Sequence, residues 1–257
     1  MCKMAAMAKR LMALAFLSVF ACSVAQAKKV QKAPKTPAPA AAAAPAPANA
    51  PSALEVSTPP ANAQELIARF EDIDRQIQSL RARYRQQVRL EEADTVQTIE
   101  GRIEYLKPDR LRIEHTKPER QTVVSDGRSI WVYRQSSNQV IQSELADWRK
   151  ADPVMSSLLD FGGYSALAKR YDVAYSSAAR EATLTPKDKA AQFTLRLKLA
   201  DKTYFPVETE LALAHMKVKT SLEGVELNPK VTESDFVFTP PSGADIFLNF
   251  KPPKVGP

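Results

Sequence analysis

Alternation of apolar and polar side chains is the feature that most limits how this chain can fold. Between Phe193 and Leu199, Phe or Leu occupies every second position, and Thr, Arg and Lys fill the positions between. A second run, from Leu80 to Leu90, has the same period with arginines on its polar side. Because successive side chains of a strand point to opposite faces, each run predicts a strand with one apolar and one polar face.

Ten or eleven strands of this kind are expected, joined mostly by short turns. The other runs lie at 99–105, 111–115, 123–124, 129–133, 138–143, 171–175, 182–184, 207–216, 218–222 and 236–238. No helix separates them in the regular manner of βαβ units, which argues against a parallel sheet. The pattern therefore predicts a mainly β (α+β) protein built on one antiparallel, strongly bent sheet.

Two segments have helical patterns instead. Asn62 and Glu65 have the spacing of a capping box, and apolar residues then recur every three or four positions for about fifteen residues. Between Glu144 and Arg170 the apolar spacing indicates short helices, and Gly162-Gly163 is either an ordinary helix stop or a hinge. We expect both segments to cover the concave face of the sheet.

The first 27 residues have the three parts of a secretory signal peptide. A basic start is followed by the apolar run Leu11 to Val19, too short to span a bilayer, and by the small-x-small site Ala25 to Ala27. We therefore expect a periplasmic protein. Cys22 leaves an alternative open, since its lipidation would anchor the chain. The mass of the mature protein, starting at Lys28 or at a triacylated Cys22, would distinguish the two.

Residues 28–63 are predicted to form a disordered tether. Of these 36 residues, 13 are Ala and 8 are Pro, so they lack the large apolar side chains that a core needs. Residues 64–250 are expected to form the folded domain, with 251–257 as a tail. Residues 1–63 also carry +6 of the formal charge of +7, which leaves the domain nearly neutral. This distribution argues against a nucleic-acid-binding surface.

A series of motifs extends along the predicted domain. Leu106 to Arg112 contains Lys-Pro, a second Pro follows at 118, and Val123 to Tyr133 reads Val-Val-Ser-Asp-Gly-Arg-Ser-Ile-Trp-Val-Tyr. Asp152-Pro153, Leu184 to Lys187 and Phe236 to Ala244 continue the series. In this order and spacing, over about residues 64 to 248, the chain resembles the LolA-type outer-membrane lipoprotein carriers.

The resemblance implies a half-open β-barrel with an N-terminal helix and a helical lid over an apolar cavity. It implies a periplasmic chaperone that takes lipoproteins from an inner-membrane exporter to an outer-membrane acceptor by binding their acyl chains. Period-two alternation on the strands and apolar clustering in the insert then suggest the residues that line this cavity: Leu111, Ile113, Trp131 and Tyr133 from the sheet, and Met155, Leu158 and Leu159 from the lid.

Lys107 departs from the family pattern. The resemblance places a lid-latching Arg directly before the first Pro, where this chain has Lys107. An ammonium group lacks the planar fork with which a guanidinium holds two carbonyls, so a Lys107 latch should be weaker.

Two other classes of function remain as alternatives. One is a membrane-anchored acceptor or regulatory sensor of lipoproteins that uses the same fold. The other is an enzyme, but Glu114 and His115 point to opposite faces of their strand and no nucleophile accompanies them. We expect a monomer that needs no cofactor or metal ion. The arginines at 81, 83, 85 and 89 form either a solvated face or a docking surface for an acidic partner.

Overall fold

The computed structural model describes residues 58–91, 95–151, 163–187 and 193–251. Within these residues lie three α-helices and one 3₁₀-helix: α3 (Ala63–Gln76), α4 (Leu145–Ala151), α6 (Tyr164–Lys169) and η1 (Glu233–Phe236). The predicted signal peptide and most of the predicted tether lie outside the described residues, so those assignments stay predictions. No helix in the described part of the chain is both long enough and apolar enough to cross a membrane.

Twelve strands form a single sheet. Their bounds are β1 (Ser79–Leu90), β2 (Thr95–Leu106), β3 (Arg110–Lys117), β4 (Gln121–Asp126), β5 (Ser129–Arg134), β6 (Gln139–Glu144), β7 (Tyr171–Ser176), β8 (Glu181–Pro186), β9 (Phe193–Leu199), β10 (Pro206–Leu213), β11 (Met216–Leu227) and β12 (Asp245–Phe247). The order across the sheet is β12-β6-β5-β4-β3-β2-β1-β11-β10-β9-β8-β7. The predicted mainly β fold with one antiparallel sheet is thus confirmed, except that β12 joins β6 in parallel.

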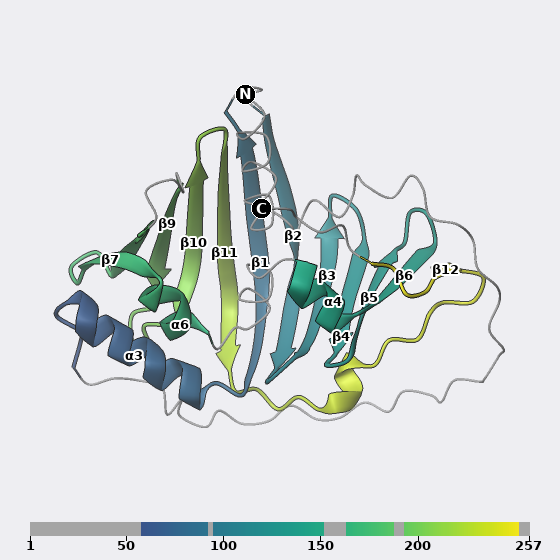
Figure 1. Ribbon diagram of the computed structural model, residues 1–257, viewed down its shortest axis with the longest axis horizontal. Coiled ribbons are helices and arrows are strands. Elements are labelled where there is room, and N and C mark those ends of the chain that lie inside the picture. Colours follow the sequence, from purple (N-terminus) through teal and green to yellow (C-terminus); the bar gives the residue numbers. More distant parts are fainter. Residues whose placement is uncertain (1–57, 92–94, 152–162, 188–192, 252–257) are drawn as a thin grey trace.

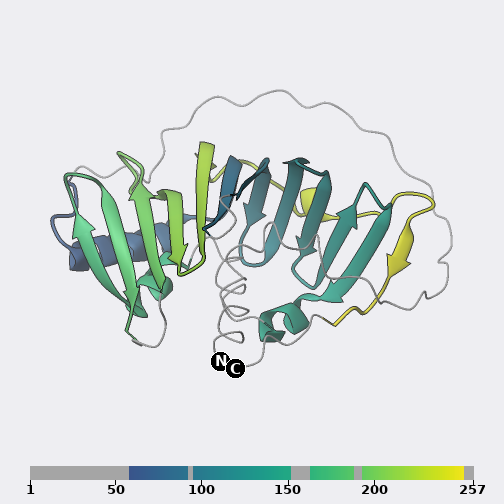
Figure 2. The same cartoon turned by 90° about the horizontal axis from the view of Figure 1, so that it is seen from above.

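The sheet is an open, curved arc with β12 and β7 at its two edges (Figure 1). Seen from above, α3, α4 and α6 all lie on the inner side of this arc (Figure 2). Helices α3 and α6 lie by the half that ends in β7, and α4 lies by the half that ends in β12. The two faces of the sheet are therefore distinct environments, an inner face towards the helices and an outer face.

Helix α3 begins where the sequence predicts. The Asn62 side chain accepts a hydrogen bond from the Glu65 backbone N–H at 3.0 Å, and the Glu65 carboxylate accepts one from the Ala61 N–H at 2.8 Å. These bonds satisfy donors that a helix start otherwise leaves unpaired. The helix ends at Gln76, after which the chain turns directly into β1.

The apolar side of α3 packs onto the inner face of the sheet. Leu66, Phe70, Ile73 and Ile77 are fully buried in one cluster with side chains of the central strands and of β8 to β11. The Phe70 ring contacts Tyr164 of α6, with ring centroids 6.0 Å apart. Burial of one large side chain of this kind stabilises a fold by about 1.5–3 kcal/mol, so this helix is a major part of the core.

Polar contacts fix α3 to its neighbours at two places. Midway along it, the buried Arg69 guanidinium donates two hydrogen bonds to the Thr203 carbonyl, at 3.1 and 3.2 Å. Near its end, the Asp74 carboxylate accepts hydrogen bonds from the Tyr164 and Ser165 backbone N–H groups at 3.1 and 2.8 Å. Asp74 thus caps the first turn of α6 and joins the two helices.

The prediction of a strand at 236–238 is wrong. Residues 233–236 form η1, and the chain then crosses the outer face of β3 to β5 as an extended segment. The Arg112 guanidinium holds this segment by donating to the Asp235 and Val237 carbonyls at 2.7 and 3.1 Å. Phe236 is fully buried. The alternating Phe-Val-Phe pattern therefore reflects one side of a covering segment packed on the sheet.

Arg112 and Arg102 offer a test of this attachment, because both contact Glu114 but only Arg112 also holds the C-terminal segment. We expect Arg112→Ala to lower the free energy of unfolding by about 1.5–3 kcal/mol, since charged donors leave two carbonyls without partners. Arg102→Ala removes only an exposed ion pair and should cost at most about 1 kcal/mol. Urea unfolding of both variants checks this, and equal losses would contradict it.

Candidate functional site

The inner face of the central strands carries two apolar rows on the side that α3 covers. Register pairs Ala82 of β1 with Ile103 of β2, and Ile103 with Ile113 of β3. A second row parallel to it joins Leu80, Tyr105 and Leu111. All of these side chains are buried in the main apolar cluster. Leu111 and Ile113, two of the residues predicted to line a cavity, therefore lie on the face that carries the helices.

Trp131 and Tyr133, also predicted to line the cavity with Leu111 and Ile113, lie on the opposite face. Ile113 pairs with Val123, which pairs with Val132, so Val132 of β5 is the inner residue. The neighbouring Trp131 and Tyr133 point outward, with ring centroids 5.8 and 6.3 Å from that of Phe238. Their placement on the inner face was wrong, because alternation within one strand does not fix its phase relative to the next.

The predicted lid residues Met155, Leu158 and Leu159 lie outside the described residues. The helices on either side of this gap, α4 and α6, are both present as the sequence predicts. Leu145 and Trp148 of α4 are buried. The assignment of the three residues to a cavity stays a prediction.

Lys107 contacts helix α3 in the described structure. Its ammonium group donates to the Asp74 carbonyl, and its backbone N–H donates to the Gln78 carbonyl at 2.8 Å. The Asp74 carbonyl belongs to the last turn of α3, where carbonyls lack helical partners. Because the Asp74 side chain caps α6, Lys107 is linked to α6 through one intervening residue. Burial raises the pKa of Asp74, while the N–H groups and Lys107 act in the opposite sense.

Polar side chains interrupt the apolar inner face at its centre. Tyr84 and Gln86 project from β1, and His115 projects from β3 beside Tyr84, with ring centroids 6.0 Å apart in an edge-on arrangement. Burial lowers the pKa of His115 to about 4 and raises that of the Tyr84 hydroxyl. Both groups are therefore neutral near pH 7.

Gly101 makes room for this polar group. It lies between Tyr84 and His115 in the register, and a Cβ atom there would come within 2.8 Å of the Tyr84 hydroxyl oxygen and 2.3 Å of the Glu114 carbonyl oxygen. The Tyr84 ring therefore lies across the glycine. Only a residue without a side chain fits at position 101.

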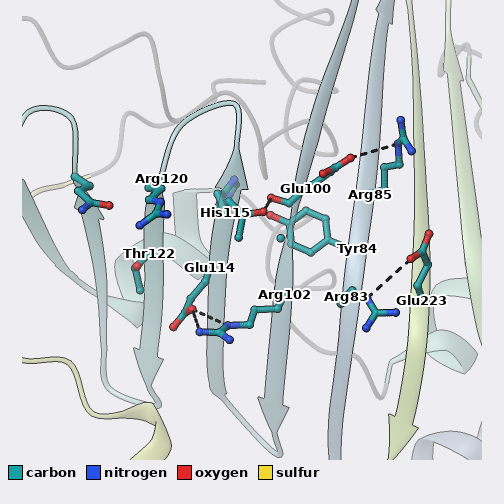
Figure 3. A pocket seen from close by; sticks show the side chains of 13 residues that line it. Arg83, Tyr84, Arg85, Glu100, Arg102, Glu114, His115, Arg120, Thr122 and Glu223 are labelled. Atoms are coloured by element: carbon teal, nitrogen blue, oxygen red, sulfur yellow. Dashed lines mark hydrogen bonds and ion pairs between the residues drawn. The ribbon is translucent and has the colours of Figure 1, made fainter.

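The outer face carries a charged groove of about 710 Å³ over the central strands (Figure 3). Its side chains include Arg83, Arg85, Glu100, Arg102 and Glu114, with backbone at Gly101. Neighbouring strands supply ion pairs along it, Arg85 with Glu100 at 3.8 Å and Arg102 with Glu114 at 2.5 Å. Four arginines and three glutamates line the groove, and so charged a lining does not suit an apolar ligand.

The arginine side of β1 is neutralised by carboxylates on the adjacent strands. Arg81 contacts Glu104 at 2.8 Å and Glu226 at 3.5 Å, and Arg83 contacts Glu223 at 4.0 Å. Cross-strand pairs of opposite charge are typical of a solvated sheet face. This pairing favours the interpretation of the β1 arginines as a solvated face over that of a docking surface for an acidic partner.

Sequence reasoning placed Tyr84 and Gln86 on a strand but did not identify them as site residues. The sequence did contain a signal for a polar site. Gln86 occupies an apolar position of the alternating series, and the next two strands along the chain carry Gly101 and His115. In the described ranges, no three His, Cys, Asp or Glu side chains come together as metal ligands would.

The buried His115 side chain should make the free energy of unfolding depend on pH. The unfolded chain takes up a proton at His115 with a pKa near 6.5, and the folded chain does so only near 4, so acid favours the unfolded state. Between about pH 7 and pH 5, wild type should lose about 2 kcal/mol more than His115→Gln. Urea unfolding at both pH values measures this. His215→Gln, at an exposed turn residue, should behave as wild type, and parallel losses in all three proteins would contradict the assignment.

The sequence is similar to those of outer-membrane lipoprotein carrier proteins. An outer-membrane lipoprotein carrier protein of Alkalilimnicola ehrlichii is 30% identical over 196 residues, which cover 76% of this chain and 88% of the relative. That of Halorhodospira halophila is 27% identical over 196 residues, covering 76% and 91%. A solved LolA superfamily protein from Nitrosomonas europaea is 14% identical with a TM-score of 0.44, over 70% of this chain and 99% of that one.

The family model described as outer membrane lipoprotein carrier protein LolA matches residues 75–239. This range begins in the last turn of α3 and ends after η1, so it contains β1 to β11 and all the residues of the inner face discussed above. The match spans well over half of the chain, and the protein therefore belongs to the LolA family of outer membrane lipoprotein carrier proteins.

Proposed function

We propose that this protein is a periplasmic carrier that binds the acyl chains of lipoproteins on its inner face and moves them from the inner to the outer membrane. The observation that carries the proposal is the largely apolar inner face over the central strands of an open sheet, in a chain of the LolA family. Each CH₂ group removed from water contributes about 0.8 kcal/mol, so partly buried acyl chains suffice for tight binding.

In this proposal the two faces of the sheet have different functions. Acyl chains need apolar surface, which the inner face supplies, whereas the outer face carries paired charges and the C-terminal segment. In this proposal an inner-membrane exporter loads the carrier and an outer-membrane acceptor unloads it.

Leu90 and Val96 provide a matched test of which face binds lipid. Both are exposed apolar residues, 43% and 52% accessible, on adjacent strands near the same end of the sheet. Leu90 is in phase with the inner residues of β1, and Val96 pairs with Arg89 and faces outward. We expect Leu90→Glu to weaken binding of a fluorescent triacylated lipopeptide at least severalfold, since it places a charge where acyl chains pass.

Val96→Glu should bind the same lipopeptide as wild type does. Fluorescence titration of the three proteins gives the comparison, and thermal melts establish that each is folded. Failure of the wild-type protein to bind would contradict the carrier function. Equal weakening by both substitutions would contradict the assignment to the inner face.

Lys107 is proposed to regulate release through the contact with α3. Its loss should loosen α3 and the capped start of α6, and Lys107→Leu should therefore speed transfer of a labelled lipoprotein to outer-membrane vesicles. Lys107→Arg should slow transfer, because a guanidinium can hold two carbonyls. Lys117→Leu is the control, since Lys117 also precedes a proline but pairs with Glu100 at 2.9 Å on the exposed outer side. Indistinguishable transfer by all four proteins would remove Lys107 from the mechanism.

A further inference from the structure

Among the described residues, two polar atoms at the centre of the inner face have no hydrogen-bond partner. They are the Tyr84 hydroxyl oxygen and the Gln86 amide oxygen. Their residues are only 4% and 1% exposed, respectively. The Gln86 amide nitrogen does have a partner, the Thr220 hydroxyl of β11 at 3.0 Å, so the orientation of this amide leaves its acceptor oxygen free. Buried polar atoms without partners are rare in native proteins and frequently mark a functional position.

The two groups form a defined pair. Tyr84 and Gln86 are two residues apart on one strand, so both point to the inner face with a separation of about 7 Å along β1. The Tyr84 ring is held by Gly101 beneath it and His115 beside it. The hydroxyl can donate and the amide oxygen can accept. The pair is complementary to a ligand that presents a carbonyl and an N–H group near each other.

The exposed fraction of the inner-face side chains rises towards one end of β1. The inner-face residues Leu80, Ala82, Tyr84, Gln86 and Val88 are all buried, and the next one, Leu90, is 43% exposed. The end of the strand at Leu80 is covered by α3, whereas the end at Leu90 extends past the described helices (Figure 1). The inner-face side chains on the Leu80 side of the pair are already packed with those of α3, and the exposed apolar surface of β1 lies on the Leu90 side.

Acylated N-termini match this arrangement chemically. In a lipoprotein, ester carbonyls and an amide N–H lie within a few bonds of one another, at the junction between the acyl chains and the polypeptide. Bound with its acyl chains over Leu90, the exposed apolar residue at the end of β1, such a group would place this junction at Tyr84 and Gln86. The hydrocarbon would then contact apolar side chains. The ester and amide linkages would meet the Tyr84 hydroxyl and the Gln86 amide oxygen, which are buried polar atoms without partners among the described residues of the central strands.

We propose that Tyr84 and Gln86 form a subsite for the polar linkage of an acylated lipoprotein N-terminus, with the hydroxyl donating to an acyl carbonyl and the amide oxygen accepting from the acyl amide N–H. This subsite rests on the proposed carrier function and specifies which part of the cargo is recognised by hydrogen bonds. It makes the inner face selective for lipoprotein anchors over other apolar molecules.

The test compares Tyr84→Phe and Gln86→Met with two controls. Tyr133→Phe removes a hydroxyl on the outer face, and Gln87→Met changes the next residue of β1, which points outward. The probes are a synthetic triacylated lipopeptide and a hydrocarbon-matched fluorescent alkane without ester or amide groups. Each inner-face variant should bind the lipopeptide about tenfold more weakly, which corresponds to about 1.4 kcal/mol, and should bind the alkane as wild type does.

The thermal midpoint distinguishes a binding role from a structural one. Removing the partnerless Tyr84 hydroxyl oxygen should leave the midpoint of the unliganded protein unchanged or raise it, although it weakens lipopeptide binding. Lipopeptide affinity of Tyr84→Phe and Gln86→Met equal to that of the controls would overturn the subsite while leaving the carrier function intact. Absence of lipopeptide binding by wild type would instead overturn the carrier function.

Discussion

A wide open sheet with one apolar face creates a physical problem that determines the rest of this structure. Twelve strands in linear order expose two broad faces, and the alternation of side chains makes the inner one apolar. Water strongly disfavours such a surface, so it must be covered by the chain or by a ligand. Helices α3 and α6 cover the half towards β7, where Phe70, Tyr164 and Phe205 form a continuous aromatic contact. A family of carriers for acylated proteins has an evident use for the remaining surface.

The way α3 is attached shows how cover and release are compatible. Its apolar side is buried in the core, which resists detachment, but its contact with α6 depends on a few polar atoms near Asp74. Hydrogen bonds to a charged group each contribute about 1.5–3 kcal/mol, so such a contact is strong enough to hold and weak enough to open. Lys107 adds one more bond to the same residue. The Lys107 side chain thus contacts the helix whose Asp74 side chain caps α6.

Features that depend on residues close together in the sequence could be predicted, whereas features that depend on distant residues could not. Local signals were reliable: the capping box at Asn62, the alternation of β1 and the turn at Asp126 all occur in the structure. The relative phase of neighbouring strands was not local, which is why Trp131 and Tyr133 were placed on the wrong face. The segment at 236–238 failed for a related reason, because a chain packed flat on a sheet produces the same period of two as a strand.

The polar centre of the inner face was missed for a different physical reason. Gln86 continues the series Leu80, Ala82, Tyr84, Val88 in phase, but nothing in the sequence shows that Thr220 orients its amide or that its oxygen has no partner. Each such atom costs a folded protein about 1–3 kcal/mol, a large share of the 5–15 kcal/mol that typically separates folded from unfolded states. Leucine or methionine at position 86, and phenylalanine at position 84, would avoid that cost with nearly the same shape. The two polar atoms at the centre of the inner face therefore leave the folded chain less stable than an apolar pair would, and a ligand that presented a carbonyl and an N–H group to them would restore the difference.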